Sequence, residues 1–165
     1  RRSSIDAYEA TTTLSARLHA ECFYLAGPIV CDSEASRDTL VRQPMLQDVL
    51  DRALRADIAV ISVGGLDSGT IRRMHFVDEA EFQDVRAAGA IGNFLGYYID
   101  DEAEIIDHPV NRRVIGLNPR DLARIPLRMM ISGGATKVQA LAAILRRRLL
   151  TGLVTDQRTA RALLK

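Results

Sequence analysis

The chain has 165 residues, of which 47% are hydrophobic and 26% charged, and its formal net charge is +1. This length suits one domain with a buried core, and the composition excludes wholesale disorder. The near-zero charge argues against a free-standing DNA-binding module, which usually has a pI above roughly 9.

The cysteines and the hydropathy pattern bear on the compartment. Cys22 and Cys31 lie in or next to apolar segments without metal-ligand spacing, which is typical of buried thiols in a reducing compartment. No run reaches the roughly 20 apolar residues of a membrane span, and no signal peptide is visible. We therefore expect a cytoplasmic protein without membrane partners. The start at Arg1, without Met, is typical of a piece of a longer protein.

The first half of the chain is predicted to contain helices and two strands. Helical spacing covers Ile5–Leu18, Ser33 is a plausible N-cap, and Pro44 suits the first turn of a helix. The predicted elements are a helix at 5–18, a strand at 21–25, a helix from Ser33 to about Arg42, a helix at 45–54, and a strand at 57–63 that ends at Gly64-Gly65.

The second half continues the alternation of helices and strands. The predicted elements are a helix at 78–88, a glycine-rich segment at 89–100 ending in an aromatic strand, a polar hairpin at 101–111, a strand at 113–116, a helix at 119–125, a strand at 127–131, a helix from about Thr136, a strand at 152–155 and a helix at 156–164 capped by Thr155 or Asp156.

This order predicts an α/β fold: a Rossmann-like, mostly parallel sheet with helices on both faces. In such sheets ligands collect at the carboxyl ends of strands. Three predicted strand ends carry glycines, at Gly64-Gly65, Gly89 to Gly92 and Gly133-Gly134. We expect a ligand site there.

The turn Ser132-Gly133-Gly134, followed by Lys137, is the most specific local signal. Two glycines let the backbone approach a ligand closely, the first turn of the next helix offers free N–H groups, and Lys137 adds a positive charge. The turn therefore predicts a site for phosphate or another small anion. The alternative is an ordinary strand-to-helix connection. It is not a Walker A loop, because Lys137 follows Thr136 and precedes Val138.

Five segments, in order, resemble one known family. They are Ala26-Gly27-Pro28 through Asp32-Ser33-Glu34 and Arg37, Ala56–Val60 with Val63-Gly64, Gly89–Asn93 with Gly96-Tyr97-Tyr98, Ile125-Pro126 with Gly133-Gly134 and Lys137, and Leu153–Asp156 with Ala160 and Ala162–Leu164. The pattern resembles the C-terminal effector-binding domain of SorC/DeoR-type bacterial transcription regulators. Each motif alone is weak, but five in order are specific.

The resemblance implies a sheet like those of ribose-5-phosphate isomerase and glucosamine-6-phosphate deaminase. It also implies a phosphorylated sugar or polyol as effector, a homo-oligomer (dimer or tetramer), and no cofactor. Residues 1–165 would then form an effector-binding and oligomerisation domain that is incomplete at its N-terminus. DNA would be contacted only by an N-terminal helix-turn-helix that is missing here.

The resemblance also assigns effector contacts. Lys137, Gly133 and Gly134 match the family's anion-binding turn, and Gly64 and Gly65 lie at its second strand end. Arg72, or alternatively Arg73, matches an effector-contacting arginine, since a guanidinium binds phosphate with two hydrogen bonds. Asn93 stands where relatives usually have Asp or Glu, and Asp6 where they place a polar ligand-facing residue. For each of these side chains the alternative is a plain surface or turn residue.

No catalytic or metal-binding set is predicted. His19, His75 and His108 are scattered, and Asp100-Asp101-Glu102 with Glu104 is typical of a solvated acidic turn. We therefore expect a sensor, not an enzyme. Two rivals remain: a phosphosugar isomerase or deaminase on the same sheet, and a degenerate domain that serves only assembly.

Overall fold

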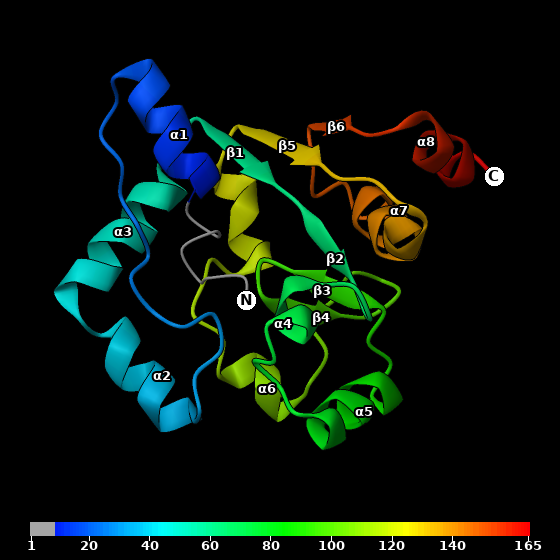
Figure 1. Cartoon of the computed structure of the whole chain (residues 1–165), viewed down its shortest axis with the longest axis horizontal. Helices are drawn as coiled ribbons and strands as arrows, with labels where there is room; N and C mark the ends of the chain where they lie inside the picture. Colours follow the sequence, from blue (N-terminus) through cyan, green and yellow to red (C-terminus); the bar gives the residue numbers. More distant parts are fainter. Residues whose placement is uncertain (1–8) are drawn as a thin grey trace.

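The computed structural model describes residues 9–165, which form an α/β structure (Figure 1). The first half contains α1 (Glu9–Leu18), α2 (Glu34–Val41), α3 (Pro44–Leu54), β1 (Ile58–Ile61), β2 (Val63–Gly65), α4 (Thr70–Arg73) and α5 (Glu79–Ala87). The second half contains β3 (Gly92–Phe94), β4 (Tyr97–Ile99), α6 (Pro109–Arg112), the 3₁₀ helix η2 (Pro119–Arg124), β5 (Leu127–Ile131), the 3₁₀ helix η3 (Ala135–Lys137), α7 (Val138–Arg146), β6 (Gly152–Val154) and α8 (Gln157–Leu163).

Three strands form a parallel sheet in the order β1-β5-β6. One face is covered by α7, whose residues Leu141 and Ile144 are fully buried against Met130 of β5. This amphipathic helix follows β5 closely in the chain and lies below β6 in Figure 1. The predicted α/β fold with a parallel sheet flanked by helices is confirmed.

The opposite face of the parallel sheet is exposed among the described residues. Side chains alternate between the two faces of a strand, and the outward set is apolar. Its members are Ile58, Val60, Leu127, Ile131 and Val154, each about half exposed or more, with Val60 at 65%. The expected cover of helices on both faces is therefore not provided by residues 9–165.

The other three strands form an antiparallel sheet in the order β2-β3-β4 that the sequence did not predict. The chain passes from β1 through Ser62 directly into β2, so one continuous extended segment serves both sheets (Figure 1). A second buried cluster, which includes Phe82, Tyr98 and Val110, packs between this sheet, α5 and α6. The antiparallel sheet thereby separates two hydrophobic cores.

The predicted helix starts are confirmed where a capping residue was visible. Ser33 accepts a hydrogen bond from the Ser36 N–H at 3.1 Å, Asp78 caps α5, and Pro44 occupies the first turn of α3. Of the two candidates for α8, Asp156 is the cap, with its carboxylate accepting from the Thr159 N–H. Cys22 and Cys31 are both free thiols, and Cys31 is buried.

Several predicted elements were wrong. The segment 21–25 is irregular instead of a strand, and the Arg52 guanidinium lies over the Phe23 ring. The segment 113–116 forms only an isolated bridge between Val114 and Val30. The predicted strand 57–63 is divided at Ser62 into β1 and β2, and Gly64 and Gly65 are the last two residues of β2. A short helix, α6, follows the polar turn.

Two predicted helices are partly or wholly 3₁₀ helices, which are wound more tightly than α-helices. The segment 119–124 is a 3₁₀ helix, and η3 precedes α7 at the Gly-Gly turn. Among the residues that the structure describes, no helix is both long and apolar enough to cross a membrane.

Candidate functional site

A pocket lies beside the carboxyl end of β1, where the chain leaves the parallel sheet for the antiparallel one. Its cavity volume is about 380 Å³, and it brings together Gly64, Asn93 and Lys137 of the predicted site. These three residues come from β2, β3 and the turn before α7. We call this hollow the effector pocket, after the effector contacts that the resemblance predicts, and it lies at the strand-end position expected for α/β ligand sites.

Asn93 is the most constrained side chain of the effector pocket. It is 8% exposed, and its Nδ2 atom has no hydrogen-bond partner among the described residues. Gly64 pairs with it across the sheet, and a Cβ on Gly64 or Gly69 would lie 2.7 or 2.0 Å from its amide nitrogen. The two glycines therefore hold space for this amide, whose unsatisfied polar group is a candidate ligand contact.

Lys137 supplies the charge of the effector pocket. Its side chain is half-buried, and it is the one ionisable residue among the described residues that line the cavity. A single ammonium without a nearby carboxylate in the lining favours an anionic ligand group. The predicted role of Lys137 is compatible with this position.

Hydroxyl groups complete the lining, and sequence reasoning did not identify them. Ser62 donates to Ser132 at 3.2 Å, joining the ends of β1 and β5. Ser68 and Thr136 share a hydrogen bond of 2.9 Å, which connects the loop after β2 to η3 next to Lys137. Ser62 and Ser132 directly follow β1 and β5, but serine is too common in turns to be chosen by pattern alone.

The glycines of the predicted anion turn are largely used by the protein itself. The Gly134 N–H donates to Thr159 Oγ1 at 2.8 Å, and Gly134 has φ 109°, a conformation that favours glycine. Gly133 packs so closely on Asp156 that a Cβ would lie 2.3 Å from the carboxylate. Gly65 is buried beneath the carbonyl of Thr136. None of the three is among the residues that line the effector pocket.

Arg72 points to other partners. Its guanidinium pairs with Glu79 and lies 4.4 Å from the centre of the Phe82 ring, and it does not line the effector pocket. The hydrogen bond from Gln83, together with that from Arg72, lowers the pKa of Glu79, so the pair is charged at neutral pH. Asp6 lies outside the described residues.

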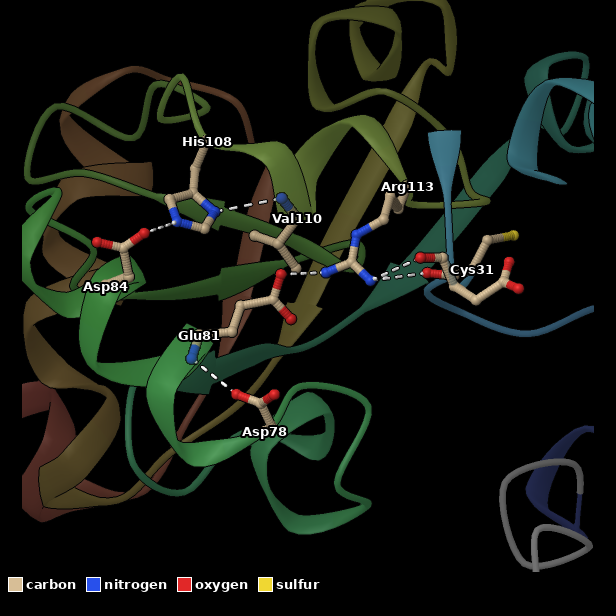
Figure 2. Close-up of polar contacts among 8 residues, drawn as sticks. Cys31, Asp78, Glu81, Asp84, His108, Val110 and Arg113 are labelled. Carbon is tan, nitrogen blue, oxygen red and sulfur yellow. Dashed lines mark hydrogen bonds and ion pairs between the residues drawn. The ribbon is translucent and has the colours of Figure 1, made fainter. Parts of the chain in front are cut away.

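A second polar cluster on α5 and α6 is structural (Figure 2). Arg113 lies between Glu81 and the Cys31 carbonyl, to which it donates at 3.0 Å. His108 caps α6: its Nδ1 accepts from the Val110 N–H at 3.2 Å, so Nε2 carries the proton toward Asp84. Burial raises the pKa of the Cys31 thiol. The cluster ties α5 to the segment before α2.

The described residues contain no group of three or more His, Cys, Asp or Glu side chains that could hold a metal ion. In the acidic turn, Asp100 accepts from the N–H groups of Glu102 and Glu104. Glu104 in turn pairs with Arg147, so these carboxylates fix a turn and a helix end.

The family model described as "Putative sugar-binding domain" matches residues 1–165. This chain belongs to that family. The resemblance to the effector-binding domains of SorC/DeoR-type regulators is thereby confirmed, and the chain is a sugar-binding domain of the kind found in transcription regulators.

Curated relatives of this sugar-binding domain are transcriptional regulators. It is 32% identical over 144 residues to the transcriptional regulator LsrR of Enterobacter sp. (strain 638), with 85% of this chain and 45% of the relative aligned. For LsrR of Escherichia coli O139:H28 the identity is 32% over 155 residues, with 90% and 49% aligned. The chain thus spans about half the length of these relatives.

Solved structures show the same fold. The full-length sorbitol operon regulator SorC from Klebsiella pneumoniae superposes with a TM-score of 0.83 at 22% identity, covering 94% of this chain and 50% of that one. A DeoR family transcriptional regulator from Listeria monocytogenes gives 0.86 at 20% identity, covering 92% and 62%.

Proposed function

We propose that the effector pocket binds a phosphorylated sugar or polyol and that this binding controls DNA binding by a helix-turn-helix domain outside residues 1–165. The observation that carries the proposal is that one pocket holds both Lys137 and Asn93, whose buried Nδ2 has no partner among the described residues. A phosphate would lie at Lys137 and sugar hydroxyls at Asn93 and Ser68, because an amide and a hydroxyl can each donate and accept. Such a regulator acts on DNA, and we therefore expect it in the bacterial cytoplasm.

Arg72 and the glycine turn have subordinate roles in this proposal. Arg72 would reach the ligand only after leaving Glu79 and Phe82, and Gly134 would act by shaping the turn, since its N–H is engaged by Thr159. We retain Asp6 as a further candidate contact on the resemblance alone.

We also propose that chain outside residues 1–165 completes the domain. The apolar face around Val60 and Leu127 is half exposed, and β1 lies at one end of the strand order. Open apolar faces and unpaired strand edges favour aggregation unless they are covered. Further strands and helices of the same domain would cover both, and the finished domain would associate as a dimer or tetramer.

The proposal is for a sensor and not an enzyme. An isomerase or deaminase needs a general base near the sugar carbons, and the residues that line the effector pocket include neither a carboxylate nor a histidine. A turnover assay with pentose and hexosamine phosphates tests this rival directly, since product formation would favour it.

The decisive experiment is calorimetry on the full-length protein with a panel of phosphorylated sugars and polyols, followed by operator-DNA binding with and without the best ligand. We expect one ligand class to bind and to change the DNA affinity, because a ligand shifts an equilibrium by its differential affinity for two states. Binding without any effect on DNA would contradict the regulatory role. Absence of binding across the panel would favour a domain that serves only assembly.

A further inference from the structure

A second hollow lies away from the effector pocket, between α2, α6 and the start of η2. Its cavity volume is about 420 Å³. Arg37 of α2, Arg112 of α6 and Arg120 of η2 line it, together with Tyr97 of β4. We call it the arginine hollow. Glu34 and Arg37 belong to the Asp32–Arg37 motif of the sequence, which has no part in the effector pocket.

The arginine hollow has an excess of positive charge. Three guanidinium groups line it against two carboxylates, those of Glu34 and Asp107. Arg37 is the most fixed of the three, because its Nε donates to the Val114 carbonyl at 3.3 Å. Three guanidinium groups from three elements face one cavity and offer several donors for anionic oxygens.

The carboxylates now paired with these arginines are weak competitors. Arg112 contacts Asp107 at 2.8 Å, but the Asp107 side chain is 95% exposed. Arg37 contacts Asp38 of its own helix at 2.9 Å, and these two side chains are 35% and 44% exposed. The remaining contacts are longer, at 3.6 Å from Arg112 to Glu34 and 3.4 Å from Arg120 to Glu104. Exposed ion pairs of this kind contribute only about 0–1 kcal/mol, so an anion that engages two guanidinium groups together can replace them.

The Tyr97 hydroxyl adds a neutral hydrogen-bonding group to the lining of the arginine hollow. Tyr97 is buried, and burial raises the pKa of its hydroxyl, so the phenol stays protonated at neutral pH. Tyr97 directly follows Leu95 and Gly96, which line the effector pocket. The two hollows share no lining residue and are separated by this turn between β3 and β4.

We propose that the arginine hollow is a second ligand site, for a small organic anion that presents at least two carboxylate or phosphate oxygens. The ligand would bridge Arg112 and Arg120 and accept a hydrogen bond from Tyr97 or Arg37. This site shares no lining residue with the effector pocket, and the turn between β3 and β4 lies between the two.

The test is calorimetry on the full-length protein with two probes, citrate for carboxylate chemistry and inorganic pyrophosphate for phosphate chemistry. We expect at least one probe to bind with a dissociation constant below about 1 mM. The double variant Arg112→Ala/Arg120→Ala should weaken that binding at least about tenfold, since it removes two charge-assisted contacts. The variant Arg124→Ala, which removes the same charge from an exposed position on η2, should leave it unchanged.

Two further variants make the result specific. Glu34→Gln should tighten probe binding, because it removes a competing carboxylate without changing the side-chain shape. Lys137→Ala should not affect probe binding at the arginine hollow. The test of this second site is therefore separate from the test of the proposed effector site. The proposal is overturned if neither probe binds, or if the arginine variants bind like Arg124→Ala. It is also overturned if they change only the mass measured by sedimentation, which would identify the hollow as a contact between subunits.

Discussion

At the scale of single residues, the effector pocket depends on what surrounds Asn93 and Lys137. Asn93 lies between Gly64 and Gly69, and its nitrogen is buried without a partner among the described residues. Leaving a buried donor unpaired costs about 1–3 kcal/mol, so proteins keep such groups where a ligand or a function uses them. Lys137 adds the charge. Residue substitutions therefore give the sharpest tests of the pocket.

Replacement of Lys137 tests the anion contact. Lys137→Ala should weaken effector binding by about 1.5–3 kcal/mol, the range for hydrogen bonds to charged groups, and should barely change the stability of the unliganded protein. Lys165→Ala, at the only other lysine of the chain, is the matched control. Calorimetric titration with the best phosphorylated ligand measures both variants. Equal affinity of Lys137→Ala and the unmodified protein would contradict the assignment.

Gly69 is a positioning residue that the sequence did not reveal. Gly69→Ala should displace the Asn93 amide, since the new Cβ would lie 2.0 Å from Nδ2, and should cost about 1–3 kcal/mol of stability along with effector affinity. Gly27→Ala is the control, because its Cβ would meet its nearest atom at an ordinary 3.7 Å. Thermal unfolding and titration measure the two effects.

A double variant distinguishes displacement of Asn93 from general strain. In Gly69→Ala/Asn93→Ala the space is free again, so the stability losses should not add. Additive losses would mean that Gly69 does not act through Asn93.

At the scale of elements, the turn before α7 and the start of α8 support each other. Thr159 is buried, accepts a hydrogen bond from the Gly134 N–H and donates to the Asp156 carboxylate at 2.7 Å. Through this one hydroxyl, the α8 cap fixes the turn that carries Lys137. The predicted anion turn is thus held by the last helix of the chain.

Removal of the Thr159 hydroxyl tests this connection. Thr159→Val keeps the side-chain shape but leaves the Gly134 N–H unpaired, so we expect a loss of about 1–3 kcal/mol in unfolding free energy. Effector affinity should fall as well, because the turn next to Lys137 loosens. Thr39→Val, on the exposed face of α2, is the control. A stability equal to that of the control would show that the connection is not used.

The acid stability of the protein should depend on Asp156. Hydrogen bonds from the Thr159 hydroxyl and N–H lower the pKa of Asp156 from 3.8. A lowered pKa in the folded state means that the carboxylate stabilises the fold above the unfolded pKa, and that this contribution is lost as the pH falls through the folded pKa. The stability difference between the unmodified protein and Asp156→Asn should therefore shrink below about pH 3.8.

Chemical denaturation at a series of pH values measures this difference. Asp101→Asn, on an exposed turn, is the control. A difference for Asp156→Asn that is constant down to the lowest pH would exclude a role for its charge.

At the scale of the whole molecule, the parallel sheet has one covered and one open face. The covered face packs on α7, and the open face exposes Val60, Leu127 and their neighbours. An exposed apolar patch of this kind marks an interface. We propose that further chain of the same domain covers it.

A charge on the open face tests that proposal. Val60→Lys should destabilise the full-length protein by about 3–5 kcal/mol, the cost of leaving a buried charge without a partner. In a fragment limited to residues 1–165 the same change should have little effect on stability. Gln47→Lys, at an exposed position on α3, is the control. An equal, small effect in both proteins would mean that the face stays open.

The sequence by itself determined the features that rest on local chemistry. Ser33, Pro44, Asp78 and Asp156 start helices because capping and proline geometry need only a few neighbouring residues. The apolar run at 127–131 had to be buried on at least one side, and the ordered motifs were sufficient for the family. These signals gave the α/β class and named Gly64, Asn93 and Lys137, which the structure brings to one pocket.

Only the tertiary structure decided the partners across the chain. The segment 21–25 has strand-like composition but is irregular, and the run from Asp57 to Gly65 serves two sheets instead of one. Likewise, Arg72 forms an ion pair with Glu79, and the Gly134 N–H donates to Thr159. Gly69 packs directly against the Asn93 amide. Strand pairing, ion pairing and close packing all depend on which distant residues arrive at a given point in space, and no local pattern contains that information.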